Sequence, residues 1–266
     1  MHYNGQGLEH EAEVVNNQQL SPRYCRLTLR CSSVAEAAKP GQFVNLLSGQ
    51  YLRRPLAVAT VDDDLFTVGI EIKGEGTREL SRLAPGETVN ILGPLGHGYT
   101  LEGAEQLLVV GGGTGIFPLQ HVLQKARAAG VPTLACFGFR SRQESFLLDE
   151  LEEQSDELVV TSDLGDLGIS GTVLRGLEAL WDSGRIRTGC RILCCGPKPM
   201  MRSVAAFAAG RELACEVSLE EHMACGVGLC LTCVCKTRNP ETEAGYRYSR
   251  SCLEGPVFAA TDVIWD

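Results

Sequence analysis

The C-terminal part of the chain concentrates cysteines at a spacing that suits metal chemistry. Cys225, Cys230, Cys233 and Cys252 are separated by four, two and eighteen residues. This C-x4-C-x2-C…C pattern is typical of plant-type [2Fe-2S] sites, in which thiolates hold the irons. We therefore expect these four cysteines to bind an iron–sulfur cluster, and we expect Cys235 to be a bystander in a β-like run.

The residues between these cysteines fit such a cluster. Gly226 and Gly228 allow the loop to adopt positive φ angles and to wrap tightly. A wrapped loop points backbone N–H groups at the sulfides, which stabilises the negative charge of the cluster. Lys and Arg are absent between Cys225 and Cys233, so the thiolates are expected to depend on iron and backbone dipoles rather than on cations.

Zinc is the main alternative at this site. Structural zinc usually binds two C-x2-C pairs, whereas this chain has one triplet and a distant fourth cysteine. A Rieske centre needs two histidines, and only His222 lies nearby. Iron–sulfur is the favoured interpretation, and zinc stays open. Six other cysteines are expected to be small core side chains, namely Cys25, Cys31, Cys136, Cys190, Cys194 and Cys215.

A glycine-rich turn lies between an apolar strand expected at 106–110 and a helix expected at 117–129. Its residues are Gly111, Gly112, Gly113, Thr114 and Gly115. At such a turn, free N–H groups and a helix dipole meet the pyrophosphate of a dinucleotide. The third glycine of the standard fingerprint is replaced by proline, and no acidic residue follows about 20 residues later. A purely steric role for the glycines therefore stays open.

Two further segments carry possible binding groups. Arg53 and Arg54, followed by Pro55, suit bidentate recognition of a phosphate, and a helix start at 74–77 would add N–H groups. A solvated edge strand explains the two arginines equally well. Residues 195–200, Cys-Gly-Pro-Lys-Pro-Met, form a strand–turn–helix junction that is also compatible with an ordinary connection.

The elements that must position these groups change in style along the chain. Residues 12–103 show short alternating strands separated by turns, with a short helix expected at 78–83, which predicts a small barrel or sandwich. From residue 105, strands and helices alternate, which predicts a parallel α/β sheet. The strands are expected at 106–110, 132–138, 157–162 and 191–195, and the helices at 117–129, 145–153, 172–181 and 199–210. Residues 214–266 show little helical periodicity.

Length and charge limit the function classes. A chain of 266 residues suggests about two domains, although the patterns above divide it into three parts. The net charge of -9 argues against nucleic-acid and anionic-membrane partners. No apolar run approaches the roughly 20 residues of a membrane span, and residues 1–10 lack the features of a signal peptide. In the cytoplasm that this indicates, the 12 cysteines are not expected to form a disulfide framework.

Several motifs in order resemble the ferredoxin-NADP reductase family. They are Arg54-Pro55-Leu56-Ala57, the Gly-x-Gly-x-x-Pro turn and Cys-Gly-Pro-x-x-Met. The stretch LEEHMACGVGLCLTC at 219–233, with CLEGPVF at 252–258, is similar to the iron–sulfur electron-transfer subunits of two-subunit, NAD-linked dihydroorotate dehydrogenases. The resemblance covers nearly the whole chain, and the cysteine segment is its most specific part.

The resemblance implies an FAD-binding β-barrel at 1–103, an NAD-binding α/β domain at 104–212 and a small [2Fe-2S] lobe at 213–266. The implied FAD contacts are Arg54, Pro55, Leu56, Ala57, Ile70, Glu71, Ile72, Gly76 and Thr77. The implied NAD contacts are Gly111, Gly112, Gly113, Thr114 and Gly115, with Cys195, Gly196 and Pro197 near the nicotinamide. Leu56 and Ala57 stand where relatives often have a hydroxyl residue.

The resemblance also implies a partner, an FMN-containing dihydroorotate dehydrogenase catalytic subunit, in a heterotetramer with two copies of each chain. The chain would then pass electrons to NAD+ in pyrimidine biosynthesis, and it needs no catalytic acid or base of its own. A reductase of another ferredoxin- or sulfur-linked complex is the alternative within redox enzymes. In that case Arg140 and Arg142 are candidates for binding an NADP 2′-phosphate, or are solvated charges. A zinc-stapled binding module is the alternative from another class.

Overall fold

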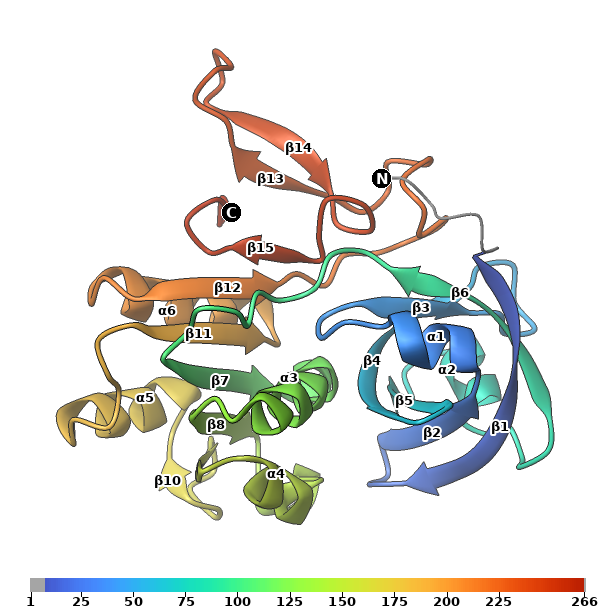
Figure 1. Ribbon diagram of the computed structural model, residues 1–266, viewed down its shortest axis with the longest axis horizontal. Helices are drawn as coiled ribbons and strands as arrows, with labels where there is room; N and C mark the ends of the chain where they lie inside the picture. Colours follow the sequence, from blue (N-terminus) through green and yellow to red (C-terminus); the bar gives the residue numbers. More distant parts are fainter. Residues whose placement is uncertain (1–7, 266) are drawn as a thin grey trace.

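The computed structural model describes residues 8–265. The expectations for residues 1–7 and for Asp266, which include most of the polar N-terminal segment, lie outside this range. Within it the chain forms a closed barrel, a seven-stranded sheet flanked by helices, and a two-stranded hairpin above them (Figure 1).

The N-terminal part is an antiparallel barrel with strand order β1-β2-β5-β4-β3-β6, as the alternating pattern predicts. In β2, for example, Leu27 and Leu29 are fully buried while Arg30 is exposed. The strands are β1 Glu9–Gln19, β2 Tyr24–Arg30, β3 Phe43–Leu46, β4 Arg54–Asp62, β5 Leu65–Glu71 and β6 Thr88–Leu95, with helices α1 Ser32–Ala37 and α2 Glu75–Leu80. Helix α2 begins earlier than expected because the Thr77 hydroxyl accepts a hydrogen bond from the Gly74 N–H (3.1 Å) and caps the helix there.

The central part is a seven-stranded sheet of order β10-β9-β8-β7-β11-β12-β15. All its strand pairs are parallel except β12 with β15, which confirms the predicted parallel α/β sheet. The strands are β7 Gln106–Gly112, β8 Thr133–Phe139, β9 Glu157–Ser162, β10 Ile169–Ser170, β11 Cys190–Cys195, β12 Ala214–Ser218 and β15 Val257–Ala259. The sequence pattern missed β10, β12 and β15, which are short.

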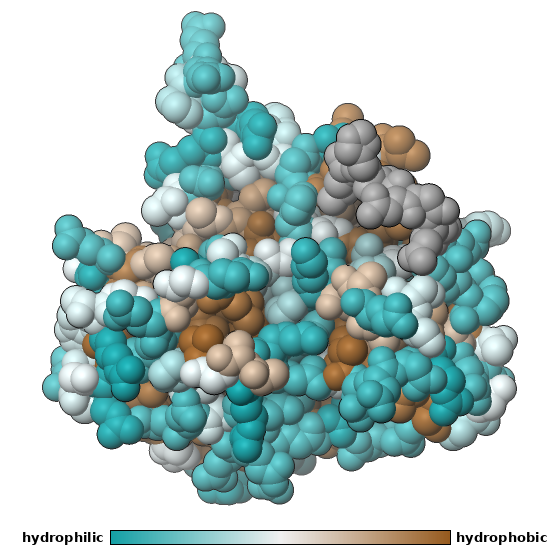
Figure 2. Space-filling view, in the orientation of Figure 1, coloured by the Kyte–Doolittle hydropathy of each residue, from teal (hydrophilic) through white to brown (hydrophobic). Residues whose placement is uncertain are grey.

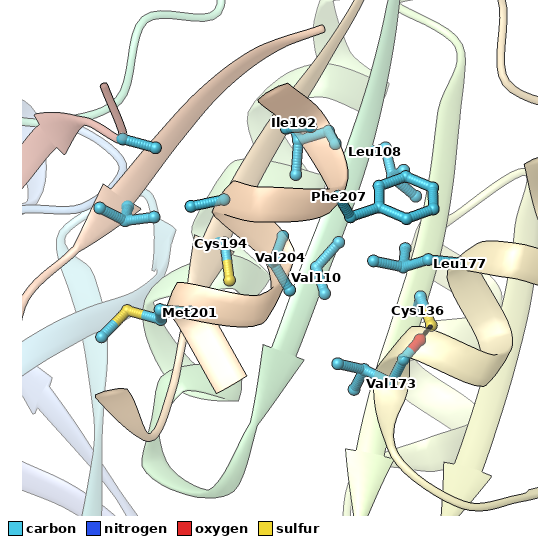
Figure 3. Close-up of a cluster of buried hydrophobic side chains, with 14 of the residues drawn as sticks. Leu108, Val110, Cys136, Val173, Leu177, Ile192, Cys194, Met201, Val204 and Phe207 are labelled. Carbon is cyan, nitrogen blue, oxygen red and sulfur yellow. Dashed lines mark hydrogen bonds between the residues drawn. The ribbon is translucent and has the colours of Figure 1, made fainter. Parts of the chain in front are cut away.

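Helices cover both faces of this sheet. They are α3 Ile116–Ala129, α4 Leu148–Gln154, α5 Val173–Asp182 and α6 Lys198–Ala209, with the 3-10 turns η1 Gly113–Gly115 and η2 Arg142–Glu144. In β7, Leu107 and Val109 pack with α3 and α4, whereas Leu108 and Val110 pack with α5 and α6 (Figure 3). Among the described residues, no helix has the length and apolar character that crossing a membrane requires.

Most cysteines outside the C-terminal group are core side chains, as expected. Cys136 and Cys194 point into the cluster of Figure 3, and the Cys136 thiol donates to the Val173 carbonyl at 3.6 Å. Burial raises the pKa of Cys136 to about 12, so the thiol stays protonated. Cys25, Cys31 and Cys190 are buried as well, and Cys215, although only half-buried, packs against the same cluster as Cys194.

The barrel and the sheet are joined through α3. The Phe117 ring lies against Gly69 of β5, where a Cβ atom would overlap it. The Gln124 side chain makes two hydrogen bonds to the backbone of Val61 in β4, one accepted (3.0 Å) and one donated (2.6 Å). These contacts hold the two parts together and create the cavity between them.

The C-terminal part consists of a loop and a hairpin. We call residues 219–233 the cluster loop; it leads into β13 Val234–Arg238 and β14 Tyr246–Arg250. After this hairpin the chain returns to the sheet as β15. Figure 2 shows hydrophilic side chains over the projecting tip of the hairpin, and hydrophobic atoms on the loop that precedes it, at the upper right.

Candidate functional site: a cluster loop and two adjoining cavities

The hairpin brings the fourth cysteine back to the other three. Cys225, Cys230 and Cys233 lie on the cluster loop, and Cys252 follows β14. The Ser251 N–H donates to the Cys233 carbonyl (2.9 Å), which places Cys252 beside Cys233. The eighteen residues between Cys233 and Cys252 therefore form the excursion of the β13–β14 hairpin.

The thiols are arranged as two pairs. The Cys230 N–H donates to the Cys225 sulfur (3.4 Å), and the Cys252 N–H donates to the Cys233 sulfur (3.4 Å). Between residues 8 and 265, no three or more His, Cys, Asp or Glu side chains are arranged to hold one metal ion. Two pairs of cysteines suit two irons that are each held by two cysteines, as in a [2Fe-2S] cluster.

The glycines of the cluster loop behave as the sequence predicts. Gly226 and Gly228 have φ angles of 71° and 85°, in the region that favours glycine. A Cβ at Gly226 would also overlap the Asn45 side chain of β3. Asn45 is fully buried and its amide nitrogen lies 3.5 Å from the Cys225 carbonyl, so the cluster loop is packed against the barrel.

One cation, outside the segment that the sequence analysis considered, lies beside the cluster loop. Arg250, at the end of β14, donates from Nη1 to the Gly228 carbonyl (3.0 Å). Its charge is close enough to Cys233 and Cys252 for both to raise the Arg250 pKa, after the larger effect of Glu254. The sequence search missed Arg250 because it considered only the residues between Cys225 and Cys233. Donors within the loop act as well, since hydrogen bonds from Thr232 and then Cys225 lower the pKa of Cys230 to about 6.

The first cavity lies between the barrel and the sheet and has a volume of about 400 Å³. Among the residues with an implied FAD contact, Arg54, Pro55, Leu56, Ala57, Glu71 and Thr77 line it. Its opposite wall includes Thr114 and Cys195, which the resemblance assigns to NAD. The sequence analysis missed Phe43, Phe117, Glu220 and Met223, which also line the cavity, because they come from segments far apart in the chain.

Some residues with an implied FAD contact lie elsewhere. Ile70 is fully buried in the barrel core, and Ile72 packs against that core, because side chains alternate between the two sides of β5. Only Glu71 of this segment lines the cavity, where it pairs with Arg23 (2.5 Å) and Lys73 (2.6 Å). Gly76 is not among the lining residues either.

The two adjacent arginines have different surroundings. Arg53 donates to the Asn90 side chain (2.5 Å) and pairs with Glu9 (3.1 Å), so it ties barrel strands together. Arg54 lines the first cavity, and its guanidinium lies against Gly76 at the start of α2, where a Cβ would overlap it. Arg54 is thus the arginine that is placed to meet an anionic ligand in the cavity.

The second cavity, of about 490 Å³, lies at the carboxyl ends of the parallel strands. Ligands of open α/β sheets bind at this edge. Gly112, Gly113 and Pro197 line the cavity, whereas Gly111, Gly115 and Gly196 do not. Gly115 has a packing role, because a Cβ there would overlap the backbone of Cys195.

The wall between the two cavities is made of the residues expected to bind NAD. On the glycine-rich turn, Gly113 faces the second cavity and Thr114 the first; on the other turn, Pro197 faces the second and Cys195 the first. An extended dinucleotide therefore fits across both cavities, with one end beside the barrel.

Of the two arginines that are candidates for binding an NADP 2′-phosphate, only one lines the second cavity. Arg140 lines the cavity together with Asp163, an acidic residue that directly follows β9 and that the sequence analysis missed. Arg142 does not line it, because its Nε donates to the Asp166 carbonyl (3.1 Å) and its N–H to the Asp166 carboxylate (3.0 Å).

The cluster cysteines and the first cavity share side chains. Phe43, Leu95, Cys233 and Cys252 form one buried cluster, and Met223 packs against it. Phe43 and Met223 also line the first cavity. A single layer of apolar side chains thus lies between two of the thiols and the cavity.

Comparison with known proteins identifies the family. Residues 220–264 match the family described as the iron-sulfur cluster binding domain of dihydroorotate dehydrogenase B. A protein of Caldanaerobacter subterraneus subsp. tengcongensis named "Dihydroorotate dehydrogenase B (NAD(+)), electron transfer subunit" is 33% identical, over 96% of this chain and 98% of its own length. The chain belongs to this family of electron transfer subunits.

Other relatives agree. A protein of Fusobacterium nucleatum with the same name is 33% identical over 95% of this chain and 97% of its own length. Among solved structures, one described as an NADH-dependent reduced ferredoxin-NADP oxidoreductase aligns with a TM-score of 0.84 and 29% identity. The alignment covers 98% of this chain and 91% of that one, so the barrel, the sheet and the cluster lobe share one arrangement in both.

Proposed function

We propose that this chain is the electron transfer subunit of an NAD-linked dihydroorotate dehydrogenase, connecting an FMN-containing catalytic subunit to NAD+ by way of a [2Fe-2S] cluster and FAD. The observation that carries this proposal is the layer of Phe43 and Met223, which touches both the cluster cysteines and the first cavity. A flavin exchanges hydride with nicotinamide and single electrons with a cluster, so FAD belongs between the two.

The roles of the residues follow from the two cavities. FAD would occupy the first cavity, held by Arg54, Pro55, Leu56, Ala57, Glu71 and Thr77. NAD would enter through the second cavity and pass between the turns at Gly113–Gly115 and Cys195–Pro197. Cys225, Cys230, Cys233 and Cys252 would hold the cluster. In terms of domains, residues 1–103 would bind FAD, 104–212 NAD and 213–266 the cluster, although β12 and β15 of the last segment belong to the sheet.

The surface for the catalytic subunit would be the exposed part of the cluster loop. Leu229 and Leu231 are 82% and 61% exposed and flank Cys230, which is itself exposed. Large exposed apolar side chains beside a redox site favour a protein partner there, since burial in an interface removes them from water. We also propose a cytoplasmic location, because a chain with 12 cysteines, four of them proposed to hold a cluster as thiolates, suits a reducing compartment.

The test separates this chain from its partner. The isolated chain is expected to reduce dyes with NADH and to show no oxidation of dihydroorotate. Adding the FMN subunit is expected to produce dihydroorotate-dependent reduction of NAD+. Appreciable dihydroorotate turnover by the isolated chain would overturn the division of labour.

A reductase of another complex is the second candidate, and it is supported by the likeness to the ferredoxin-NADP oxidoreductase structure. It predicts reduction of NAD(P)+ by reduced ferredoxin and no gain when the dihydroorotate-oxidising subunit is added. Comparing NADH with NADPH on the isolated chain then shows whether Arg140 accepts a 2′-phosphate or Asp163 repels it.

A further inference from the structure

Glu220 lines the first cavity beside the wall that separates it from the second, a position that the proposed function leaves without a role. It lies at the start of the cluster loop and lines the first cavity together with Thr114 and Cys195. One of its carboxylate oxygens accepts a hydrogen bond from the Thr114 hydroxyl (2.8 Å). Because Thr114 belongs to the wall between the cavities, the carboxylate is held where a dinucleotide would reach the first cavity.

The negative charge of Glu220 affects the part of the first cavity beside Thr114 and Cys195. Within residues 8–265 Glu220 forms no ion pair, whereas its neighbour Glu221 is paired with Lys198 (2.7 Å). Burial raises the pKa of the Cys195 thiol, and the negative charge of Glu220 raises it further. Cys195 is the side chain expected beside the nicotinamide, so an uncompensated negative charge lies close to the ring position.

We propose that Glu220 recognises the positive charge of the oxidised nicotinamide ring and makes this chain bind NAD+ in preference to NADH. The nicotinamide ring carries a positive charge in NAD+ and none in NADH, so a nearby carboxylate attracts only the oxidised form. Preference for NAD+ suits a chain that takes up NAD+ and releases NADH. The inference rests on the proposed dinucleotide site, and it adds to that site a residue that discriminates between redox states.

The experiment measures equilibrium binding rather than turnover. Dissociation constants of the flavin- and cluster-loaded chain are measured for NAD+ and for the redox-inert tetrahydro analogue of NADH, whose ring is uncharged. Glu220→Gln is expected to weaken the binding of NAD+ about fivefold, the size of effect expected for a solvent-accessible ion pair. It is expected to weaken the binding of the analogue by less than about twofold. Glu243→Gln removes the same charge from an exposed position near the tip of the hairpin and is expected to change neither constant.

Thr114 provides a second test. Thr114→Val removes the hydroxyl that holds the carboxylate, and it is expected to weaken NAD+ binding less than Glu220→Gln does. Thr114→Ser keeps the hydroxyl and is expected to keep the affinity for NAD+. Equal weakening of both ligands by Glu220→Gln, or no change in either, would overturn the role of Glu220. Binding of ADP-ribose, which lacks the nicotinamide ring, tests the dinucleotide site independently of Glu220. If the wild-type chain binds neither ADP-ribose nor NAD+, the proposed dinucleotide site itself is wrong.

Discussion

Arg250 and Glu254 form an ion pair beside the cluster loop, with the guanidinium Nη2 2.7 Å from the carboxylate Oε1. Arg250 uses its Nη1 to bind the Gly228 carbonyl (3.0 Å), so the pair ties the residues around Cys252 to the loop that carries Cys225 and Cys230. Each partner orients the other, and together they connect the segment after β14 to the cluster loop.

Removing either partner is expected to loosen the cluster. Arg250→Met and Glu254→Gln should each lower the free energy of unfolding, because each leaves hydrogen bonds unmade. In both variants, we expect a chelator to remove iron from the cluster several-fold faster than in the wild type, measured as the loss of visible absorbance. Arg247→Met, which removes an exposed cation from the same strand, is the control. Equal chelation rates for the three variants and the wild type would contradict the role of the pair.

The cysteine assignment predicts different results for neighbouring thiols. Cys225→Ser, Cys230→Ser and Cys252→Ser should each lose most of the iron and sulfide and the paramagnetic signal of the reduced state, because the site is left one thiolate short. Cys235→Ser should keep all three, since the Cys235 sulfur lies 3.5 Å from the Ser249 carbonyl and belongs to the hairpin. A chain that contains one zinc and no sulfide would contradict the cluster.

The exposed leucines predict how the partner binds. Leu229→Asp combined with Leu231→Asp should weaken association with the FMN subunit by at least about tenfold, because two carboxylates would be buried in the interface. Dye reduction by the isolated chain should persist. Leu164→Asp, at a position that is 70% exposed on another loop, is the matched control. Association is measured by titration calorimetry, and unchanged affinity of the double variant would place the interface elsewhere.

His121 makes stability depend on pH. It is fully buried in α3, and neither ring nitrogen has a hydrogen-bond partner among the described residues. Burial, and to a lesser extent Lys125, lowers its pKa from 6.5 to about 4. As the pH falls below 6.5, His121 becomes protonated in the unfolded chain, whereas in the folded chain it stays neutral until about pH 4. The free energy of unfolding should therefore fall by up to about 3 kcal/mol over this range.

Denaturant titration at several pH values checks this expectation. His121→Met keeps the volume and removes the titrating group, so its stability should depend less on pH than that of the wild type. His97→Gln removes an exposed imidazole and should leave the pH dependence in place. Parallel pH profiles for wild type and His121→Met would show that other groups cause the loss.

Gly115 predicts a link between packing and dinucleotide binding. Gly115→Ala should destabilise the chain by about 1–3 kcal/mol, because the added methyl group overlaps the Cys195 backbone. It should also weaken the binding of NADH, since both turns of the wall between the cavities would shift. Gly210→Ala is the control, because its φ of -67° suits alanine and an added methyl group would make only ordinary contacts, the shortest 3.5 Å to the Ala206 carbonyl oxygen. Thermal unfolding with and without FAD measures the first effect.

The sequence predicted most of what depends on local pattern. The cysteine spacing, the barrel strands with their alternation and the strand–helix order of the sheet all come from residues close together in the chain. The residues that it missed act at a distance along the chain: Arg250 reaches the loop only after the hairpin folds, and Glu220 gains its position from a hydrogen bond to Thr114, 106 residues away. The side chain of Ile70 faces the barrel core rather than the cavity, because a resemblance names a segment and the strand decides which side chain faces the cavity.

The cluster lobe leaves the sheet at β12 and rejoins it at the neighbouring strand β15, where Val217 pairs with Phe258. It is therefore an insertion anchored at both ends, unlike an electron carrier that swings on a single tether. Its spacing from the barrel is set by the fold and not by diffusion of a linker. Electron exchange between the lobe and the barrel should accordingly be insensitive to solvent viscosity, and the partner subunit has to come to the lobe.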